Sequence, residues 1–429
     1  MSDINTTTHV VESKPTSIRW FGGGLVFIIC MIAYLDRAVF SVTAQPVMHF
    51  LNITPVQFGL VTTLFNIGYF IFQIPGGILL EKYGTRTVLT LSLVFWSVFT
   101  LLTGMVNSLM MLMIVRFFFG IGESPVFPAG NKFFANWFPA DERGKANSLM
   151  NGGAFMASII GPPVVVLVVG HFGWQSAFFL CGALGVVISI VWFVCMRNTP
   201  AQHKSVNAAE LNKIRQGNEI STVKQKVPWK ILLRQRSFWA IAAAFFGTLW
   251  TIQFFMYWLP YYLQSARHLS FKDMGFYSSI PFIFIVVSVF LAGIISDLLI
   301  RKGFSRFFSR NVVCIAGLIL SVIGLIASTK AQTTTGNILW LSVALGGAGF
   351  AQTLAWSIAT DIGREFTSVT GSWMNTWGFI AASIVPTVAP LVANHYGWNA
   401  VLLLNAVITL IGILGFLFIK ADSPLVAQP

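Results

Sequence analysis

Long apolar stretches separated by short polar segments dominate this chain of 429 residues. A helix needs roughly 20 residues to cross a bilayer, and about twelve stretches come close to that length. They lie at 20–44, 56–80, 86–106, 109–135, 146–170, 175–197, 238–264, 274–300, 311–330, 337–360, 366–393 and 398–420. The pattern predicts an all-α integral membrane protein with twelve transmembrane helices.

Composition supports this prediction and changes how the charge is interpreted. The chain is 55% hydrophobic and only 10% charged, whereas a soluble domain carries about 25% charged residues. The net charge of +13 would suggest nucleic acid in a soluble protein, but 22 of the 27 Lys and Arg residues fall in alternate connecting segments. The positive-inside rule therefore predicts that both termini are cytoplasmic, and we expect no nucleic-acid partner.

One long polar segment divides the chain near its middle. Hydrophobicity falls and charge rises between residues 198 and 237, which predicts a cytoplasmic linker with a short surface helix at 207–216. The predicted organisation is a cytoplasmic tail (1–19), a six-helix bundle (20–197), the linker (198–237), a second six-helix bundle (238–420) and a short cytoplasmic tail (421–429). The polar first 19 residues show no signal-peptide pattern.

Two internal echoes support the division into halves. The segment His171-Phe-Gly-Trp174 recurs as His395-Tyr-Gly-Trp398, and the segment 77–86 is echoed by 293–303. The two offsets, 224 and 216 residues, are nearly equal, and both echoes fall at corresponding places in a plan of six plus six helices. Such repeats are typical of transporters built from two pseudo-symmetric halves.

Four ionisable residues interrupt the apolar stretches of the first half. Asp36 and Arg37 lie in the first stretch, and Arg116 and Glu123 lie in the fourth. Charge at this depth costs roughly 2.5 to 3.5 kcal/mol on insertion scales and usually marks an ion or substrate pathway. The four residues therefore predict a transporter, with an organic anion and a coupled cation as its cargo.

Arg116 and Glu123 are seven residues apart, so they point the same way on a helix, roughly 10.5 Å apart. Glycines and prolines around Glu123 predict a bend where another backbone or a substrate can approach. A buried carboxylate near a guanidinium can take and release a proton near neutral pH, as proton coupling requires. The alternative is a static buried Arg–Glu bridge.

Asp36 and Arg37 are adjacent, so they point about 100° apart. We expect Arg37 to face a central cavity and Asp36 to face the fourth helix near Arg116. Arginine suits a carboxylate cargo because its planar fork forms two bonds and stays charged. The alternative is that the Asp36–Arg37 pair only braces the first helix against the fourth.

The second half offers polar and aromatic side chains in place of buried charge. A polyhydroxylated cargo needs neutral donors and acceptors, with aromatic faces to shape the pocket. The candidate substrate-binding residues there are Gln253, Tyr257, Thr353, Trp356, Ser357 and Asn375. The two amides are the better candidates because an unpaired amide in a bilayer is costly.

Several motifs of this chain resemble those of one transporter family. They are Tyr34-Leu-Asp36-Arg37, Phe72-Gln-Ile-Pro-Gly-Gly77, Arg116-Phe-Phe-Phe-Gly-Ile-Gly-Glu123-Ser-Pro and Trp137-Phe-Pro-Ala-Asp-Glu-Arg143. The chain is similar to the anion:cation symporter family of the major facilitator superfamily. That family includes bacterial galactonate, glucarate and hexuronate transporters and, more distantly, sialin and the vesicular glutamate transporters.

The resemblance implies a role for each matching residue. Arg37 would bind the substrate carboxylate, Asp36 and Glu123 would carry protons, and Arg116 would tune them. Tyr34, Tyr69 and Asn375 match pocket residues of sugar-acid members. Glu81, Arg86, Asp297 and Arg301 resemble the inter-domain latch of the superfamily and would stabilise the outward-facing state.

The chain departs from the sugar-acid pattern at two positions. Ala154 stands where several members carry a glutamine, and Gln253 stands where we expect an aromatic residue in the galactonate group. These changes do not affect the predicted class of cargo, but they leave the particular sugar acid undetermined.

The prediction is a proton-coupled symporter of the bacterial inner membrane that imports a sugar acid (hexonate, hexarate or hexuronate). Its partners would be the small organic anion, protons and the lipid bilayer, and we expect a monomer that needs no cofactor and no metal. Two alternatives stay open, namely a proton symporter of an aromatic or dicarboxylic acid and a transporter-like nutrient sensor. An enzyme is not expected, because the chain shows no nucleophile–base pair, metal cluster or phosphate loop.

Overall fold

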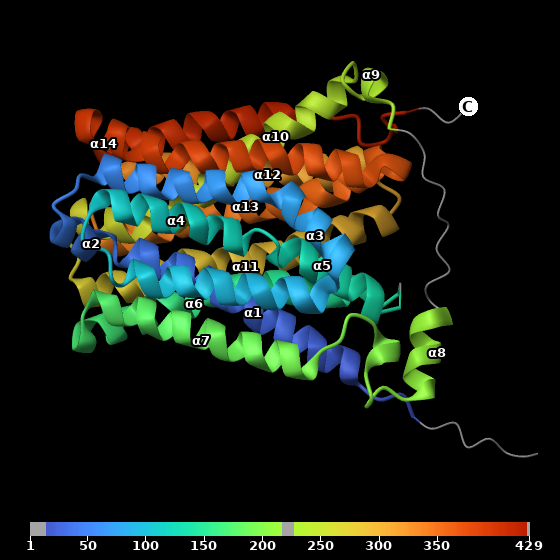
Figure 1. Cartoon of the computed structure of the whole chain (residues 1–429). Helices are drawn as coiled ribbons and strands as arrows, with labels where there is room; N and C mark the ends of the chain where they lie inside the picture. Colours follow the sequence, from blue (N-terminus) through green and yellow to red (C-terminus); the bar gives the residue numbers. More distant parts are fainter. Residues whose placement is uncertain (1–13, 140, 217–226, 427–429) are drawn as a thin grey trace, which may run out of the picture.

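The computed structural model describes residues 14–139, 141–216 and 227–426. The described residues form a bundle of long helices whose axes are roughly aligned (Figure 1). The start of α1 and the C-terminal segment lie at the same end of the bundle, at the right of Figure 1. We call this the termini end and the other the opposite end. The predicted tail at 1–13 and the linker residues 217–226 lie outside the described residues.

Helices up to the linker begin with α1 (Ile18–Val42) and the short α2 (Ala44–Leu51). They continue with α3 (Pro55–Thr103), α4 (Leu109–Glu123), α5 (Val126–Trp137), α6 (Arg143–Phe172) and α7 (Trp174–Cys195). The linker contributes α8 (Ala208–Gln216), close to the helix expected at 207–216, and α9 (Trp229–Leu232). The remaining helices are α10 (Arg236–Ser265), α11 (Phe271–Arg301), α12 (Val313–Lys330), α13 (Thr334–Gly363) and α14 (Thr367–Phe418).

Nine helical runs within the described residues are long and apolar enough to cross a membrane. Two of the helices are too long for one crossing, because α3 has 49 residues and α14 has 52, and a bilayer core is spanned by roughly 20. Each is divided at a glycine with non-helical backbone, Gly84 in α3 and Gly397 in α14. The all-helical membrane fold is confirmed, and the count of twelve crossings stays a prediction.

The glycines of the repeated His-x-Gly-Trp segment share one backbone conformation. Gly173 has φ 81° and ψ 166°, and Gly397 has φ 78° and ψ 168°. This combination is nearly restricted to glycine, because a Cβ would clash with the backbone. The sequence echo thus corresponds to the same sharp break at two places 224 residues apart.

Helix contacts fall into two groups. In the first group α3 packs against α4 and α7, and α1 packs against α6; in the second group α10 packs against α14, and α13 packs against α11 and α12. Among the described residues, the groups meet mainly where α3 packs against α14, α6 against α11 and α1 against α10. We refer to them as the first and second helix groups; the exact domain bounds stay a prediction.

Hydrogen bonds join the two groups in the half of the bundle away from the termini. The Thr63 hydroxyl on α3 donates to the Ser383 carbonyl oxygen (2.8 Å) and lies 2.9 Å from the Thr387 hydroxyl. The backbones are so close beside them that a Cβ on Gly59 would lie 2.1 Å from the Pro386 carbonyl oxygen. These contacts close the bundle toward the opposite end.

If the chain is the transporter that its sequence predicts, a disulfide across this contact should stop transport. We expect a Thr63→Cys/Thr387→Cys variant to form a bridge on oxidation, because the two hydroxyl oxygens are already neighbours and a disulfide needs such proximity. The closed opposite end would then be locked, and substrate uptake should fall to background and return after reduction. Uptake by each single-cysteine variant under oxidising conditions is the control, and undiminished uptake by the cross-linked protein would show that this contact does not have to open during transport.

A second network ties the linker to the first helix group at the termini end. Arg19 at the start of α1 pairs with Glu142 before α6 (2.8 Å) and with Glu210 of α8 (2.9 Å). Lys213 of α8 also binds Glu142 (2.6 Å), and the Thr16 hydroxyl donates to Glu210 (2.5 Å). Because the Glu210 side chain is fully buried, α8 is a docked part of the first helix group.

Glu142 makes this network sensitive to acid. The hydrogen bond from Arg19, followed by the one from Lys213, lowers the pKa of the Glu142 carboxyl to about 2. A group with a lowered pKa contributes stability above its ordinary pKa and loses that contribution as the pH falls toward the folded value. A Glu142→Gln variant should therefore unfold at a lower temperature than the unmodified protein at pH 7.

The difference should shrink as the pH falls below about 4.5, and thermal unfolding in detergent across this range measures it. Asp141→Asn, which removes the exposed neighbouring carboxylate, serves as the control and should behave like the unmodified protein. An unchanged difference between Glu142→Gln and the unmodified protein down to pH 3 would show that the ion pairs contribute little.

Candidate functional site

An ion pair between α1 and α4 forms the centre of the candidate site. Both the Nε and Nη2 atoms of Arg37 donate to the Oε1 atom of Glu123, at 2.9 and 2.5 Å. The two side chains are 6% and 1% exposed, while the second oxygen of Glu123, Oε2, has no hydrogen-bond partner in the described residues. The pair is thus buried but incompletely satisfied.

The bend predicted near Glu123 is present and places this carboxylate. Helix α4 ends at Glu123 and α5 begins at Val126 after Ser124 and Pro125. One turn before Glu123, a Cβ on Gly120 would lie 2.2 Å from the Phe65 carbonyl oxygen. The close approach of α3 and α4 therefore requires glycine, and it brings α3 side chains up to the ion pair.

Aromatic rings surround the Arg37 guanidinium. Its central carbon lies 4.8 Å from the ring centre of Tyr34, 5.1 Å from that of Phe65 and 5.5 Å from that of Tyr69. Tyr69 in turn stacks on Phe379 of α14 at 5.1 Å. Such ring faces attract a cation and hold its orientation, and the Tyr69–Phe379 contact links the site to the second helix group.

Arg116 occupies a neighbouring, mainly aromatic environment. Its guanidinium carbon lies 4.2 Å from the ring centres of both Phe40 and Phe119. Its Nε and Nη1 atoms lack hydrogen-bond partners among the described residues, and so do both carboxylate oxygens of Asp36. Asp36 and Arg116 are close enough to attract each other electrostatically, and the Thr100 and Trp96 side chains lie near enough to Asp36 to act as weak donors.

Two expectations for this region are therefore corrected. Glu123 pairs with Arg37 and not with Arg116, so the static Arg116–Glu123 bridge considered above is wrong. Arg37 faces α4 as well, although we expected only Asp36 to do so. The angle of 100° between adjacent residues fixes only the direction in which each side chain leaves the helix. The long Arg37 side chain can therefore still bend toward α4 and bind Glu123.

The candidate residues of the second helix group are not all at one place. The Tyr257 hydroxyl donates to the Asn66 side-chain oxygen (3.1 Å), and Asn66 donates to the Ala382 carbonyl oxygen (2.9 Å). Gln253, one turn before Tyr257, is 8% exposed and its side-chain oxygen has no partner among the described residues. Tyr257 and Gln253 therefore lie at the boundary between the two groups.

The other four positions lie nearer the termini end or toward the surface. Trp356 is 45% exposed and contacts the Phe245 ring. Ser357 uses its backbone carbonyl to accept a hydrogen bond from Arg310. Thr353 and Asn375 are partly buried, and their role as substrate ligands stays a prediction.

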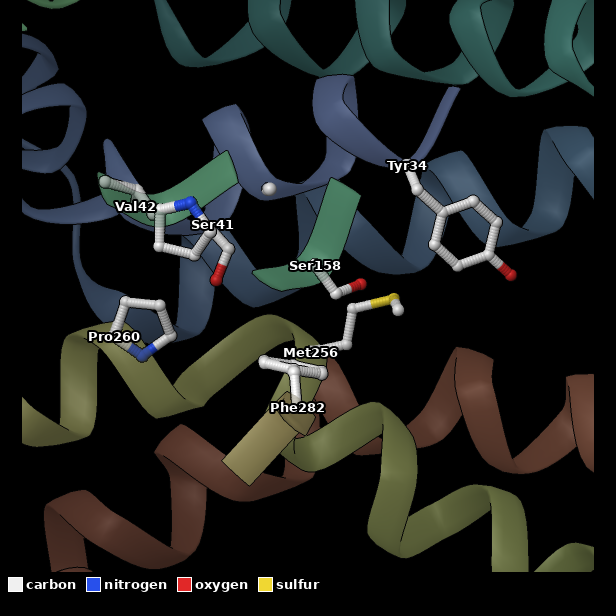
Figure 2. Close-up of a pocket in the computed structure, with 9 residues that line it drawn as sticks. Tyr34, Ser41, Val42, Ser158, Met256, Pro260 and Phe282 are labelled. Atoms are coloured by element: carbon white, nitrogen blue, oxygen red, sulfur yellow. The ribbon is translucent and has the colours of Figure 1, made fainter. Parts of the chain in front are cut away.

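A small cavity lies beside Tyr34, between α1, α6, α10 and α11 (Figure 2). Three hydroxyl-bearing side chains, those of Tyr34, Ser41 and Ser158, contribute to its wall. The remaining lining residues are Ala38, Val42, Pro162, Met256, Pro260 and Phe282. The space next to the aromatic cage of Arg37 is thus mainly apolar.

The residues that resemble a latch make contacts within the first helix group. Glu81, whose side chain is 80% exposed, pairs with Lys132 of α5 (2.9 Å). Arg86 donates to the Phe193 carbonyl oxygen (2.9 Å) and lies over the Phe193 ring, while Asp297 and Arg301 of α11 are exposed. Their role as a latch stays a prediction.

Asn66 is the residue that the sequence interpretation missed. An amide within an apolar stretch is a costly feature, so the same argument that singled out Gln253 and Asn375 applied to it.

Among the described residues, no group of three His, Cys, Asp or Glu could hold a metal ion.

The fold and this site define a class, that of helical membrane carriers with two helix groups and a buried charged site beside the boundary between them. Residues 26–386 match the Major Facilitator Superfamily, and the chain belongs to that family. It is therefore an integral membrane transporter and not an enzyme.

Known relatives of this chain are named as transporters of organic acids. The chain is 33% identical over 95% of its length, and 92% of the relative, to "Probable galactarate/D-glucarate transporter GudP" of Bacillus subtilis (strain 168). It is 30% identical to "Probable L-galactonate transporter" of Escherichia coli (strain K12), with coverage of 97% and 91%. "Probable sulfoacetate transporter SauU" of Cupriavidus necator is 29% identical, with coverage of 94% of both chains.

A solved structure shows the same fold. A bacterial homolog of the human lysosomal transporter Spinster, in an inward-facing and unoccupied conformation, has a TM-score of 0.78 at 15% identity, covering 96% of this chain and 98% of its own.

Proposed function

We propose that this protein is a proton-coupled symporter that imports an organic anion, with a sugar acid (hexonate, hexarate or hexuronate) as the first candidate. The observation that carries the proposal is the Arg37–Glu123 pair, because Arg37 is buried and already binds a carboxylate. The names of the galactarate, glucarate and galactonate relatives support a sugar acid. We further propose a monomer in the bacterial inner membrane, with cytoplasmic termini and no cofactor.

The proposed cycle exchanges one carboxylate for another at Arg37. With the site open to the outside, a proton binds the Glu123 carboxylate, which then no longer neutralises Arg37. The cargo carboxylate takes its place between the Arg37 fork and the tyrosines. The contacts at the opposite end then close, the site opens toward the termini end, and cargo and proton leave.

The membrane potential decides how many protons are useful. An inside-negative potential opposes entry of a monoanion by about 2.3 kcal/mol per 100 mV. One proton cancels this cost and leaves only the pH gradient as a driving force, whereas a second proton makes the potential favourable. Asp36, which is buried and has no ion pair with Arg37 or Arg116 within 4 Å among the described residues, is the proposed carrier of the second proton.

A second candidate is a proton symporter of an aromatic or dicarboxylic acid. The specific observation that favours it is the mainly apolar wall of the cavity beside Tyr34, which offers few partners for the hydroxyls of a sugar. Ala154, buried one turn from Ser158 on α6, adds none. In this case the carboxylate chemistry of Arg37 is unchanged and only the body of the cargo differs.

Uptake into proteoliposomes tests the proposal. The labelled panel contains galactonate, gluconate, glucarate, glucuronate, galacturonate and an aromatic acid, each with and without an inward proton gradient. Gradient-dependent accumulation of one sugar acid supports the first candidate, and accumulation of the aromatic acid alone supports the second. No accumulation of any of them would count against the sugar-acid proposal and favour an anion outside the panel or a nutrient sensor with a transporter's fold.

A further inference from the structure

The segment that enters α10 carries apolar side chains on its outside. Trp229, Ile231, Leu233 and Trp239 are between 44% and 49% exposed, and we call these four residues the α9 ridge. Leu232, in the middle of the same segment, is fully buried and fixes the turn to the core. Single exposed apolar residues are common, but four within eleven positions form a patch that requires a covering partner.

Basic side chains surround the α9 ridge. Lys230, Arg234 and Arg236 alternate with its members, and all three are exposed. Lys420 joins them from the end of α14, because its backbone N–H donates to the Ser237 hydroxyl (3.1 Å). Residues 227–239 contain no Asp or Glu, and the nearby Asp422 uses its carboxylate to bind the backbone N–H groups of Arg306 and Phe307.

The patch is continuous with the lipid-facing surface of α14. An exposed apolar stripe follows this helix through Val407, Leu410, Leu414 and Leu417 to Phe418. The Arg236 guanidinium lies 4.0 Å from the ring centre of Phe418, the last residue of α14. Figure 1 places α9 at the edge of the termini end, next to the start of α10. The α9 ridge therefore lies at the end of this exposed apolar stripe.

We propose that the α9 ridge and the four cations Lys230, Arg234, Arg236 and Lys420 form a binding site for anionic phospholipid headgroups. Tryptophan and aliphatic side chains enter the boundary between headgroups and acyl chains, while the cations bind the phosphates. The lipid would hold the start of α10 at a fixed depth. The proposal does not depend on which cargo the protein carries.

Lipid retention by the purified full-length protein tests this site. The protein is equilibrated with an equal mixture of phosphatidylglycerol and phosphatidylcholine of the same acyl chains, and retained lipid is counted by native mass spectrometry. We expect the unmodified protein to prefer phosphatidylglycerol. The variant Lys230→Gln/Arg234→Gln/Arg236→Gln/Lys420→Gln should lose at least about tenfold of that preference, because each cation near an anionic surface contributes about fivefold.

A matched variant separates a local site from general attraction. Lys14→Gln/Lys145→Gln/Lys204→Gln/Arg215→Gln removes the same amount of charge from exposed positions of the first helix group and α8, and it should keep the preference. An equal loss in both variants, or no preference in the unmodified protein, would overturn the proposal. If the first variant does not fold, as judged by its thermal unfolding, Lys230→Gln/Arg234→Gln should show a smaller loss at two exposed positions, and an unchanged preference in it would also count against the site.

Discussion

A Glu123→Gln variant should lose gradient-driven accumulation of cargo and retain exchange of labelled for unlabelled cargo. Glutamine has nearly the shape of a protonated glutamate but cannot release a proton, so it resembles the carrier fixed in its protonated state. In the empty site Arg37 is paired with the Glu123 carboxylate. A neutral glutamine would not neutralise Arg37, which would stay free to bind the cargo carboxylate. Accumulation should fall to the level set by the cargo gradient alone, while counterflow should continue.

Both processes are measured in the same proteoliposomes, with accumulation under an inward proton gradient and counterflow without one. Asp273→Asn is the control, since it removes an exposed carboxylate in the first turn of α11 and should alter neither process. Loss of both counterflow and accumulation would show that Glu123 is needed for the structure of the site. Normal accumulation would remove it from the coupling mechanism.

Replacing Arg37 should impair every step that involves cargo, whereas replacing Glu123 should impair only the coupling to protons. Arg37→Lys keeps the positive charge but not the planar fork, whose Nε and Nη2 atoms both bind Glu123 and are the proposed ligands of the cargo. Truncating one member of a buried, hydrogen-bonded charge pair costs roughly 2 to 5 kcal/mol. We therefore expect binding and counterflow to fall by at least about 30-fold.

Isothermal titration of detergent-purified protein with the cargo identified by uptake measures this loss directly. Arg267→Lys is the matched control, because Arg267 donates to backbone carbonyl oxygens of Ala331 and Thr333 on the surface away from the site. Binding by Arg37→Lys at unmodified strength would exclude Arg37 as the carboxylate ligand.

The buried charges were the part of the site that the sequence could predict. An ionisable residue in an apolar stretch stands out, so Asp36, Arg37, Arg116 and Glu123 were identified together, and all four are buried. Their pairing was not predictable. Helical periodicity gives the direction of a side chain from its own axis, whereas the Arg37–Glu123 contact depends on how α1 and α4 are set against each other.

Aromatic and surface residues were harder to interpret. Tyr69 and Trp356 look alike in a hydropathy pattern, yet Tyr69 lies in the cage around Arg37 and Trp356 is 45% exposed. In a membrane protein, aromatic rings suit both lipid and a binding pocket, so residue type alone does not separate them. Arg19 and Glu142 looked like ordinary polar residues of the connecting segments, and only the fold brings them to Glu210 of α8.

The Arg37–Glu123 pair also gives the empty carrier a built-in competitor. Glu123 is tethered next to Arg37, so its effective concentration there is set by the protein and not by the surrounding medium. Under the proposed function, a small inorganic anion such as chloride cannot displace it and occupy the carrier unproductively, however abundant that anion is. An anion can bind Arg37 only when Glu123 is protonated. The carboxylate that would couple transport to protons would therefore also exclude common inorganic ions.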